Sequence, residues 1–357
     1  MNLMRSLGPD GPSVSRIGLG LAALGRPAYI TSGRERDLPD RSVAAMRTRA
    51  FAVLDAAYAA GIRYVDAARS YGRAEEFLGA WLSRAGHQDV VVGSKWGYRY
   101  TGDWRLDAPR QEVKEHSLAM FRTQLAESRS LLGDRISLYQ VHSLTPDSPL
   151  LDDGALLAAL GDLRDSGVLV GLTTSGPRQA DVLRRALAVR VGGRPLFAAA
   201  QVTWNLLEPS VGPAAAEAAE AGWAIIVKEA LANGRLAPGG GAPAARLAAL
   251  AAEREVAGER DVAGERGVAD VAGEREVAGE RGAAAERGGG VDAIALAAAL
   301  ANPWVTVVLS GAVSPGQVRA NLAALSAGDL TSLEHDLRAL AEPPDSYWAE
   351  RSARPWR

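Results

Sequence analysis

The chain has 357 residues, of which 47% are hydrophobic, so it is long enough for one large domain or two ordinary ones. Its formal net charge of −2 gives no general attraction to nucleic acid or to anionic membranes, and the absence of cysteine excludes disulfides and thiolate chemistry. The N-terminal residues lack an apolar signal core, and the four histidines are scattered, which argues against a metal site. We therefore expect a cytoplasmic protein that acts on a small molecule, without a nucleic-acid, membrane or metal partner.

The first predicted strand, 16–20, runs into the sequence Gly18-Leu-Gly-Leu-Ala-Ala, which matches the dinucleotide-binding fingerprint Gly-x-Gly-x-x-Ala. That fingerprint needs a helix directly after the glycines, because the helix N-terminus holds the phosphates. The next residues, 25–42, contain two prolines and no apolar stripe at helical spacing. We interpret the glycines as a tight strand exit rather than a Rossmann motif.

Helices and strands then alternate without exception. Apolar spacing predicts helices over 44–60, 73–84, 110–132, 152–165, 177–190, 213–221 and 291–301. Each leads into a short apolar strand, at 62–68, 90–95, 136–143, 168–176, 196–203, 223–230 and 304–311, and two last helices occupy about 315–327 and 331–341. With the first strand this makes eight units, which predict a closed (β/α)₈ TIM barrel; a doubly wound parallel sheet is the alternative.

A low-complexity segment interrupts this pattern after the seventh strand. From Glu255 the unit x-Val-Ala-Gly-Glu-Arg repeats, between flanks rich in alanine and glycine. A charge-rich repeat with a glycine in every six residues and no aromatic residue buries too little apolar surface to order itself. We predict a single barrel domain over 1–357, in which 237–290 is a flexible or partly helical insertion. A passive repeat expansion explains it better than a partner-binding arm.

Chemically active residues cluster at the carboxyl ends of the predicted strands, where barrels of this type place their active sites. Strand two ends in Asp66 and its loop carries Tyr71, strand three ends in Lys95, and strand four ends in His142. Each has an ordinary structural explanation alone, but together they make a proton-transfer site. A lysine about 4 Å from Tyr71 would lower the pKa of the phenol by about three units before desolvation opposes it. Asp66 would hold Lys95, and His142 would donate to a substrate carbonyl oxygen.

The blocks YVDAARSYG, VVGSKWG and LYQVHS resemble three signature blocks of the aldo-keto reductases, and the resemblance covers essentially the whole chain outside the repeat. It implies a catalytic tetrad on Asp66, Tyr71, Lys95 and His142, and hydride transfer between a nicotinamide cofactor and a carbonyl carbon. Tyr71 would give its proton to the carbonyl oxygen in reduction and take it back in oxidation. The implied substrate is an aldehyde or ketone, including sugars, and the corresponding alcohol.

The same resemblance implies a cofactor bound in extended form across the barrel mouth, with NADP(H) favoured over NAD(H). The implied contacts are Gly20 and Leu21 beside the nicotinamide, Ser175 and Gln201 at its carboxamide, Lys228 against its ring, Leu231 and Arg235 near the pyrophosphate, and Gly311, Gln317 and Asn321 at the adenosine end.

Two of these positions, and the residue that follows Ser175, depart from the family pattern. Gly176 replaces an asparagine that often follows the serine, Lys228 replaces a ring-stacking aromatic residue, and Gln317 replaces a frequent basic residue. We expect the stem of Lys228 to cover the nicotinamide ring, or its ammonium to meet a phosphate. Ser314 or Arg319 would hold the 2′-phosphate of NADP.

Aromatic residues after strands three and six suggest a substrate pocket walled by Trp96, Tyr98 and Trp204. The C-terminal tail, with its aromatic residues, is expected to fold over the mouth. Two other functions stay open: an NADP-binding, redox-sensing regulatory subunit with little turnover, and a barrel hydrolase that uses Asp66 and Glu229 as its carboxylates.

Overall fold

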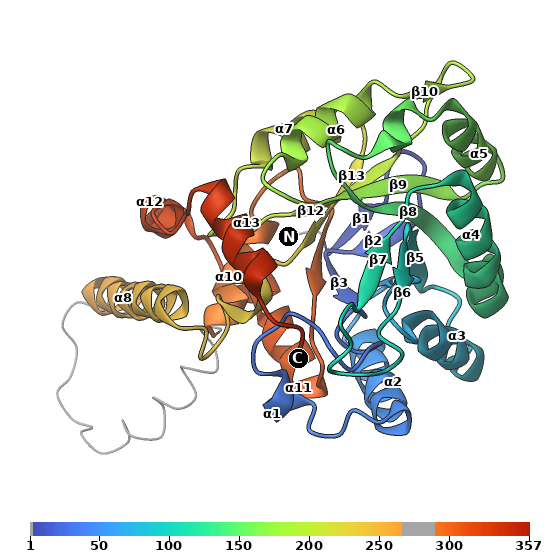
Figure 1. Cartoon of the computed structure of the whole chain (residues 1–357). Helices are drawn as coiled ribbons and strands as arrows, with labels where there is room; N and C mark the ends of the chain where they lie inside the picture. The colour runs from blue at the N-terminus through green and yellow to red at the C-terminus, as the bar shows by residue number, and fades with distance from the viewer. Residues whose placement is uncertain (1–2, 266–289) are drawn as a thin grey trace.

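The computed structural model describes residues 3–265 and 290–357, and of 254–265 only the backbone. Parallel strands form a closed barrel in which the last strand pairs with the first (Figure 1). The barrel strands are β3 (Ile17–Gly20), β4 (Tyr64–Asp66), β5 (Val91–Trp96), β8 (Ile136–Leu144), β9 (Leu169–Thr174), β12 (Ala199–Thr203), β13 (Ala224–Lys228) and β14 (Val307–Ser310). The predicted (β/α)₈ barrel is confirmed, and the doubly wound sheet is excluded.

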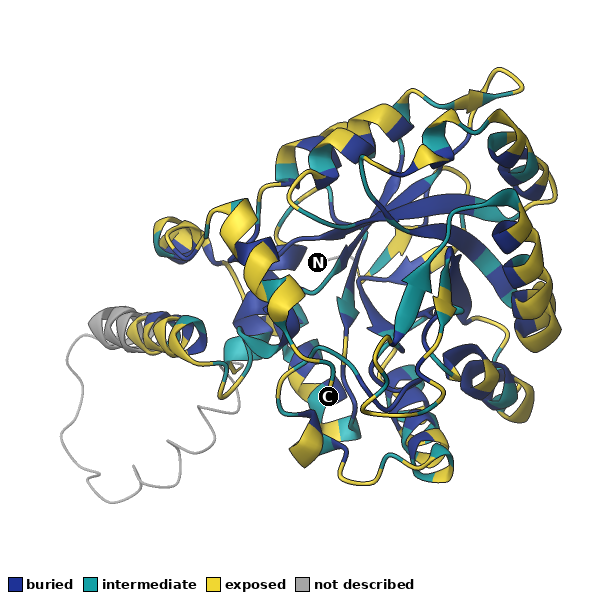
Figure 2. Cartoon of the chain, viewed as in Figure 1, coloured by how far each residue is buried: buried dark blue, intermediate teal, exposed yellow. Residues whose placement is uncertain are grey.

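Helices cover the outside of the barrel, with their inner faces buried and their outer faces exposed (Figures 1 and 2). They are α2 (Val43–Ala59), α3 (Ala74–Ala85), α4 (Leu118–Leu132), α5 (Gly154–Asp165), α6 (Gln179–Leu187), α7 (Gly212–Glu220), α10 (Val291–Leu300) and α11 (Pro315–Leu322). The further helices α8 (Ala242–Glu265), α12 (Glu334–Arg338) and α13 (Pro344–Ala353) do not belong to this outer layer. After β3 the first helix is the short α1 (Arg34–Asp37), so no helix starts at the glycine fingerprint, as the sequence predicts.

Inward-facing side chains form two layers, because alternate residues of a strand point to the same side. The lower layer is apolar and contains Tyr64, Leu138 and Ile226; a hairpin of β1 (Met4–Ser6) and β2 (Ser13–Ser15) adds Leu7 and Val14 beneath it. Two or four residues further toward the carboxyl ends of these strands, the inward-facing side chains form a polar layer. Its members are Asp66, Lys95, Gln140, Gln201 and Lys228. The apolar floor therefore supports a polar layer at the carboxyl ends of the strands.

The sequence predicts one helix over 110–132, but the structure divides this segment. β7 (Glu112–Lys114) pairs antiparallel with β6 (Tyr98–Tyr100), and α4 begins only after Ser117, whose hydroxyl accepts the Met120 N–H at 3.1 Å. The predicted apolar stripe belongs to α4, and the residues before it form a hairpin at the barrel mouth instead.

Other boundaries also differ near the ends of helices. α6 stops at Leu187 and a small hairpin follows, formed by β10 (Arg190–Val191) and β11 (Arg194–Pro195). The two last predicted helices are shorter than expected and are extended by the 3₁₀ turns η4 (Ala323–Ser326) and η5 (Thr331–Leu333). The sequence predicts no helix at the position of α13.

The predicted flexible segment 237–290 begins with ordered structure. α8 packs on α10, and its side chains Leu247 and Leu250 are buried. This first part is thus helical, which agrees with the partly helical form of the prediction, because the alanine and leucine spacing there supplies an apolar helix face. The rest of the repeat, 266–289, lies outside the described residues. Among the helices described, none has the length and apolarity needed to span a membrane.

Candidate active site

Asp66 and Lys95 form a buried ion pair at the ends of β4 and β5. The side chain of Lys95 is completely buried and that of Asp66 is 2% exposed. The Lys95 ammonium also donates to the Ala67 carbonyl at 2.9 Å, while Oδ1 of Asp66 accepts from Gln201 Nε2 at 2.9 Å. Burial lowers the pKa of Lys95, and Asp66 offsets part of this effect. These bonds fix the orientation of both side chains, and each charge is largely balanced by the other.

Tyr71 lies beside this pair, with 7% of its surface exposed. Lys95 Nζ is 4.8 Å from the centre of the phenol ring, and the His142 ring packs edge-on at 5.4 Å. The sequence argument predicts a lowered pKa for Tyr71, and this is wrong for the structure. Burial raises the pKa of Tyr71 well above its ordinary value, and Asp66 raises it further. The charge of Lys95 is balanced by Asp66 and does not offset this effect.

The His142 imidazole is buried and neutral. Burial, followed by the nearby cations Lys95 and Arg26, holds the pKa of His142 well below its ordinary value. Its Nδ1 lies 3.3 Å from the Ser70 hydroxyl oxygen. When that hydroxyl donates to Nδ1, the ring hydrogen sits on Nε2, which is then a donor for a bound oxygen atom.

Two hydrogen bonds hold the peptide group between His142 and Ser143. His116 Nε2 donates to this carbonyl at 2.8 Å, and the Ser143 N–H donates to the Thr173 hydroxyl at 2.7 Å. Ser143 has φ 53°, a left-handed conformation that non-glycine residues adopt at a cost. The strained turn is thus held by His116, which precedes α4, and by Thr173 of β9. Because the backbone of His142 is fixed in this way, the position of its imidazole is fixed as well.

The expected nicotinamide contacts lie around this group. Gln201 is fully buried, and its Oε1 has no partner in the described chain. The Lys228 ammonium donates to the Thr203 hydroxyl and lies 3.8 Å from Glu229, and burial lowers the pKa of Lys228 to about 8. Ser175 lines a cavity of about 470 Å³ at the ends of β8 and β9, which it shares with Thr145, Pro146, Asp147, Gly176, Pro177 and Arg178.

The expected adenosine contacts already have partners inside the protein. Gln317 donates from Nε2 to Asp37 at 3.0 Å and accepts the Val313 N–H at 2.8 Å. Asn321 is 4% exposed and donates to the Ser310 hydroxyl at 2.7 Å. These side chains therefore shape the loop after β14, and the bonds they make there limit how freely they can turn toward a ligand.

The expected backbone contacts differ in how open they are. Gly311 is exposed with open space where a side chain would begin, whereas the Leu21 N–H already donates to the Asp66 carbonyl at 2.9 Å. Gly20 ends β3 and is partly exposed. Leu231 starts a tight turn in which its carbonyl accepts from Gly234 and Leu236.

Of the three aromatic residues expected in the substrate pocket, only Tyr98 lies at the mouth. Its ring packs edge-on against His142 at 5.0 Å, and burial raises the pKa of Tyr98 to about 12. Trp96 follows the inward-facing Lys95 and so points outward, where its ring packs on Phe121 of α4. Trp204 packs edge-on against Trp304 and is 8% exposed. We therefore remove Trp96 and Trp204 from the pocket.

Comparison with known proteins identifies the family. The sequence model of the aldo/keto reductase family matches residues 16–337. The chain belongs to the aldo/keto reductase family. A relative named aldo-keto reductase str7, from Strobilurus tenacellus, is 36% identical over 141 residues, or 39% of this chain and 38% of the relative. D-threo-aldose 1-dehydrogenase of a Pseudomonas species is 31% identical over 192 residues, 49% of this chain and 56% of that protein. The matches to these two relatives thus span only about four to six tenths of their lengths.

Solved structures support the same fold. The aldo-keto reductase AKR11C1 of Bacillus halodurans, in its holo form, superposes with a TM-score of 0.63 at 22% identity and covers 95% of this chain and 96% of its own. A Pseudomonas aeruginosa structure with the same family name gives a TM-score of 0.61 at 24% identity, covering 92% of this chain and 96% of that one. The barrel described above is thus shared over nearly the whole length of this aldo/keto reductase.

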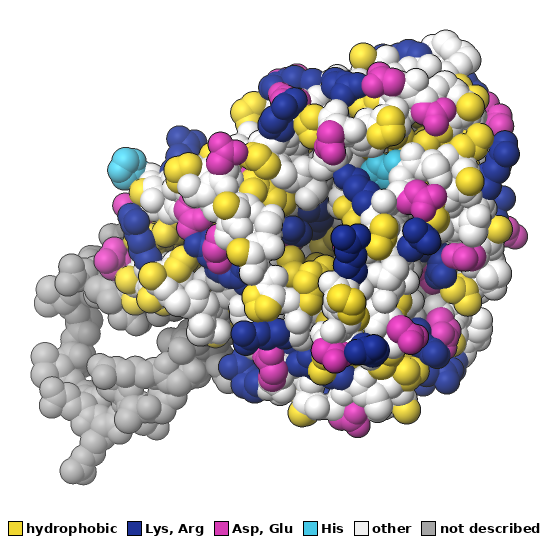
Figure 3. Space-filling view, viewed as in Figure 1, with side chains coloured by type: hydrophobic (Ala, Val, Ile, Leu, Met, Phe, Trp, Pro, Cys, Tyr) yellow, Lys and Arg dark blue, Asp and Glu magenta, His cyan; other side chains and the backbone are white. Residues whose placement is uncertain are grey.

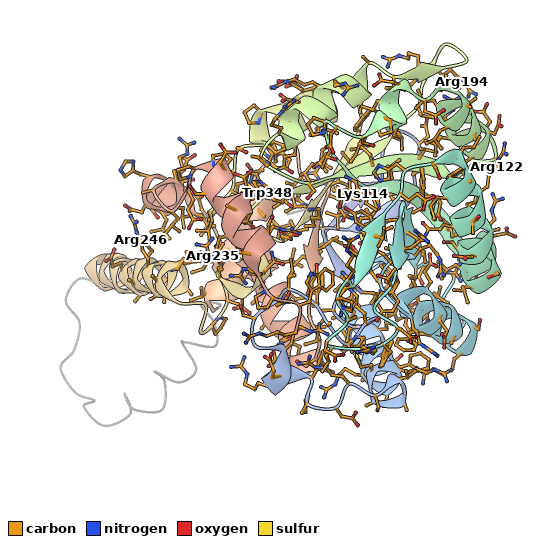
Figure 4. All side chains as sticks on the ribbon, viewed as in Figure 1. Lys114, Arg122, Arg194, Arg235, Arg246 and Trp348 are labelled. Atoms are coloured by element: carbon orange, nitrogen blue, oxygen red, sulfur yellow. The ribbon has the colours of Figure 1, made fainter. Side chains whose placement is uncertain are left out.

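The C-terminal tail folds beside the barrel mouth, as the sequence predicts. Trp348 of α13 (Figure 4) donates to Glu208 at 3.1 Å, and the Tyr347 hydroxyl accepts from Asn205 at 3.0 Å. Arg351 pairs with Glu229, and although burial opposes it, Arg351 and Lys228 lower the pKa of Glu229 to about 2. Arg235 also lies beside α13, where it pairs with Glu342 and Glu350.

Several residues near the site are missed by the sequence argument. Gln140 is two residues before His142 on β8 and faces the same interior, so strand alternation would have found it. No sequence pattern indicates that Arg26 lies near the site, because it belongs to an irregular loop far from Tyr71 in sequence. Its guanidinium is nevertheless 4.9 Å from the centre of the Tyr71 ring. Figure 3 shows basic side chains gathered in and around the hollow at the centre of this face.

Proposed function

We propose that this aldo/keto reductase is an NAD(P)H-dependent oxidoreductase that interconverts an aldehyde or ketone and its alcohol. The observation that carries the proposal is the convergence of Tyr71, His142, Lys95 and Asp66 at the carboxyl end of the barrel. Lys95 Nζ lies 4.8 Å and the His142 ring centre 5.4 Å from the centre of the Tyr71 ring, and Asp66 pairs with Lys95. Membership of the family supports the same reaction.

The residues present fit a nicotinamide cofactor. The unpartnered, buried Oε1 of Gln201 is an acceptor suited to a carboxamide N–H, and Ser175 stands at the edge of the same mouth. The loop after β13 has left-handed backbone at Glu229, Ala232 and Asn233, a concentration of strain that is typical of ligand-binding loops. When bound, the cofactor would supply or accept the hydride.

Tyr71 is proposed as the general acid and base. Its raised pKa keeps the phenol protonated at neutral pH, which is the form that reduction requires. The neutral His142 imidazole donates to the carbonyl oxygen from Nε2, which fixes the oxygen next to the phenol and stabilises the charge that develops on it. The buried pair of Asp66 and Lys95 lies beside the ring and belongs to the polar layer that surrounds it.

We propose NADP(H) as the preferred cofactor and a sugar as one substrate class. Arg319 is exposed on α11 and adds a positive charge to this helix, which favours a 2′-phosphate, although it points to a different side of the helix from Gln317; Asp37, which accepts from Gln317, opposes it. The sugar proposal follows the name of the aldose dehydrogenase relative and the rim cavity beside Ser175. A lower KM for NADH than for NADPH would contradict the cofactor preference.

The carboxylate hydrolase alternative fits less well. A glycosidase needs one carboxyl group with a raised pKa to act as the general acid. The pKa of Glu229 is lowered to about 2, because Arg351 and Lys228 outweigh the effect of its burial. Glu229 thus cannot be that acid, and Asp66, the other carboxylate, is held in a buried ion pair with Lys95.

The test is turnover by a Tyr71→Phe variant. NADPH or NADH oxidation is followed with a panel of aldehydes and ketones, and the reverse reaction with aldoses. We expect Tyr71→Phe to lose at least a hundredfold in kcat, in line with loss of a general acid, and to keep cofactor binding. Tyr58→Phe is the matched control, because its hydroxyl pairs with the exposed Asp89. Turnover that survives in Tyr71→Phe would overturn the mechanism, and tight cofactor binding without turnover in the wild type would favour the regulatory subunit.

We also propose that the repeat within 237–290 is a passive insertion in a single barrel domain. Excision of 253–287 keeps the buried Leu247 and Leu250 of α8. We expect kcat and the melting temperature to be unchanged, and a large loss of either would show that the repeat takes part in folding or function.

A further inference from the structure

Arg26 is a buried cation at the barrel mouth that lies outside the tetrad. The residue is 2% exposed. Its guanidinium carbon lies 4.9 Å from the ring centres of Tyr71 and Tyr29 and 4.6 Å from that of Trp356. Three aromatic faces thus enclose one positive charge, and one of them belongs to the proposed acid.

The position of Arg26 is fixed by bonds on both sides. Nη1 donates to the Ser70 carbonyl at 3.1 Å and to Glu112 Oε2 at 2.8 Å. Arg34 Nη2 donates to the Arg26 carbonyl at 2.9 Å, which holds the backbone. The preceding Gly25 is packed so closely that an added Cβ would lie 2.3 Å from the Tyr71 carbonyl oxygen. The loop after β3 therefore packs tightly against Ser70 and Tyr71, and the Arg26 guanidinium lies over the Tyr71 ring.

Several charged and titratable groups act on Tyr71 from the surrounding elements. They are Asp66 of β4, Lys95 of β5, Glu112 of β7, His142 of β8, Glu229 after β13, and the phenols of Tyr29 and Tyr64. The largest effect on Tyr71 is burial, which raises its pKa, and the carboxylates of Asp66, Glu112 and Glu229 act in the same direction. Arg26 acts in the opposite direction.

The charge of Arg26 also reaches other members of the tetrad. It helps to lower the pKa of His142, after burial and Lys95, and so supports the neutral imidazole. The charge of Lys95, by contrast, is balanced by Asp66 in a buried ion pair. Arg26 is itself paired with Glu112, but that carboxylate is 21% exposed and more strongly screened by water.

We propose that Arg26 is a positioning residue for the proposed reaction: its guanidinium, held over the Tyr71 ring by Ser70 and Glu112, stabilises the phenolate that forms when Tyr71 gives its proton to the carbonyl oxygen. In the reverse direction the same contact stabilises the phenolate that accepts the proton from the alcohol. This inference rests on the proposed function, because it requires Tyr71 to exchange a proton with the substrate.

The test compares variants that change the charge near Tyr71 in opposite directions. Arg26→Met removes the cation, Glu112→Gln removes the anion, and Arg26→Lys keeps the charge. Arg99→Met and Glu115→Gln are matched controls, because this pair lies on the same β6–β7 hairpin with side chains 56% and 38% exposed. The readout is the rise of alcohol oxidation with pH between about pH 7 and 10, measured with the purified full chain and saturating cofactor, together with cofactor binding by fluorescence.

We expect this rise to move up by about one pH unit in Arg26→Met and down by a smaller amount in Glu112→Gln, with kcat at a fixed pH reduced several-fold in Arg26→Met. Arg26→Lys and the two controls should keep the wild-type pH profile. A loss of kcat in Arg26→Met without any shift of the profile would show a purely structural role and overturn the proposal.

Two further outcomes separate the possible failures. If Arg26→Met does not fold, as judged by cofactor binding and circular dichroism, Glu112→Gln decides alone, and an unchanged profile in it overturns the proposal. If Tyr71→Phe keeps wild-type turnover, the proposed function itself is wrong. If Tyr71→Phe is inactive and neither Arg26→Met nor Glu112→Gln shifts the profile, only the role of Arg26 is wrong.

Discussion

Replacement of Asp66 by asparagine should destabilise the protein strongly at neutral pH. The change keeps the shape of the side chain and removes the negative charge that faces the Lys95 ammonium, whose side chain is completely buried. The Ala67 carbonyl, at 2.9 Å, would still accept from Lys95 but carries no charge. Leaving a buried charge without its partner typically costs about 3–5 kcal/mol, and we expect a loss of that size in the free energy of unfolding at pH 7.

The same variant should recover stability as the pH rises. Burial already lowers the pKa of Lys95, and loss of Asp66 lowers it further. Unfolded lysine keeps a pKa near ~10.4, so between the two values the unfolded chain binds more protons and stability increases with pH. This window reaches lower pH in Asp66→Asn than in the wild type. The difference in unfolding free energy between them should therefore shrink from pH 7 to pH 9.5.

The assay is urea unfolding followed by tryptophan fluorescence at both pH values. A double variant, Asp66→Asn with Lys95→Met, should regain most of the lost stability but no turnover, because it removes the buried charge together with the active-site pair. Asp89→Asn is the control: its pair with Arg63 is 54% exposed on the aspartate side, and its loss should cost less than about 1 kcal/mol. A loss below about 1 kcal/mol in Asp66→Asn at pH 7, or a loss that does not change with pH, would refute the reasoning.

Two further predictions concern packing and acid stability. Gly93→Ala would place a Cβ 2.3 Å from the Tyr64 hydroxyl oxygen, so we expect a loss of about 1–3 kcal/mol that Tyr64→Phe partly restores; equal losses in both backgrounds, measured by urea unfolding, would contradict this contact. Burial lowers the pKa of His116 to about 4, so the unfolded chain binds the extra proton as pH falls below ~6.5, and His116 should account for about 2 kcal/mol of lost stability between pH 7.5 and 5. The variant His116→Gln should lose correspondingly less stability over this range in urea unfolding, and an equal acid loss in both proteins would count against the assignment.

The barrel could be predicted from the sequence because its signals are local and repeated. Each helix and strand carries its own apolar period, and the order of the elements then leaves few topologies. The proximity of Asp66, Lys95 and His142 follows from the same pattern. These residues lie at or within two residues of the carboxyl ends of successive neighbouring strands, and the carboxyl ends of parallel strands converge at one mouth.

Side-chain direction at the end of a strand was harder to predict. Trp96 directly follows Lys95, and as a loop residue it could have faced the mouth. The structure extends β5 by that one residue, so the alternation of the strand turns the ring outward onto Phe121. The β6–β7 hairpin was hard to predict for a related reason: the pairing of two strands across a loop depends on two segments that meet in space. Neither segment carries that information alone.

The pKa of Tyr71 depends on how the charges at the mouth are paired, which composition does not reveal. The sequence places a lysine near the phenol, and an isolated lysine would lower the pKa. In the folded chain Lys95 is matched by Asp66, Arg26 by Glu112 and Arg351 by Glu229. Lys228 differs, since its closest partner is a hydroxyl group and its pKa falls to about 8. With its close cation neutralised, burial decides the direction for Tyr71, and proton transfer then depends on the groups that stabilise its phenolate.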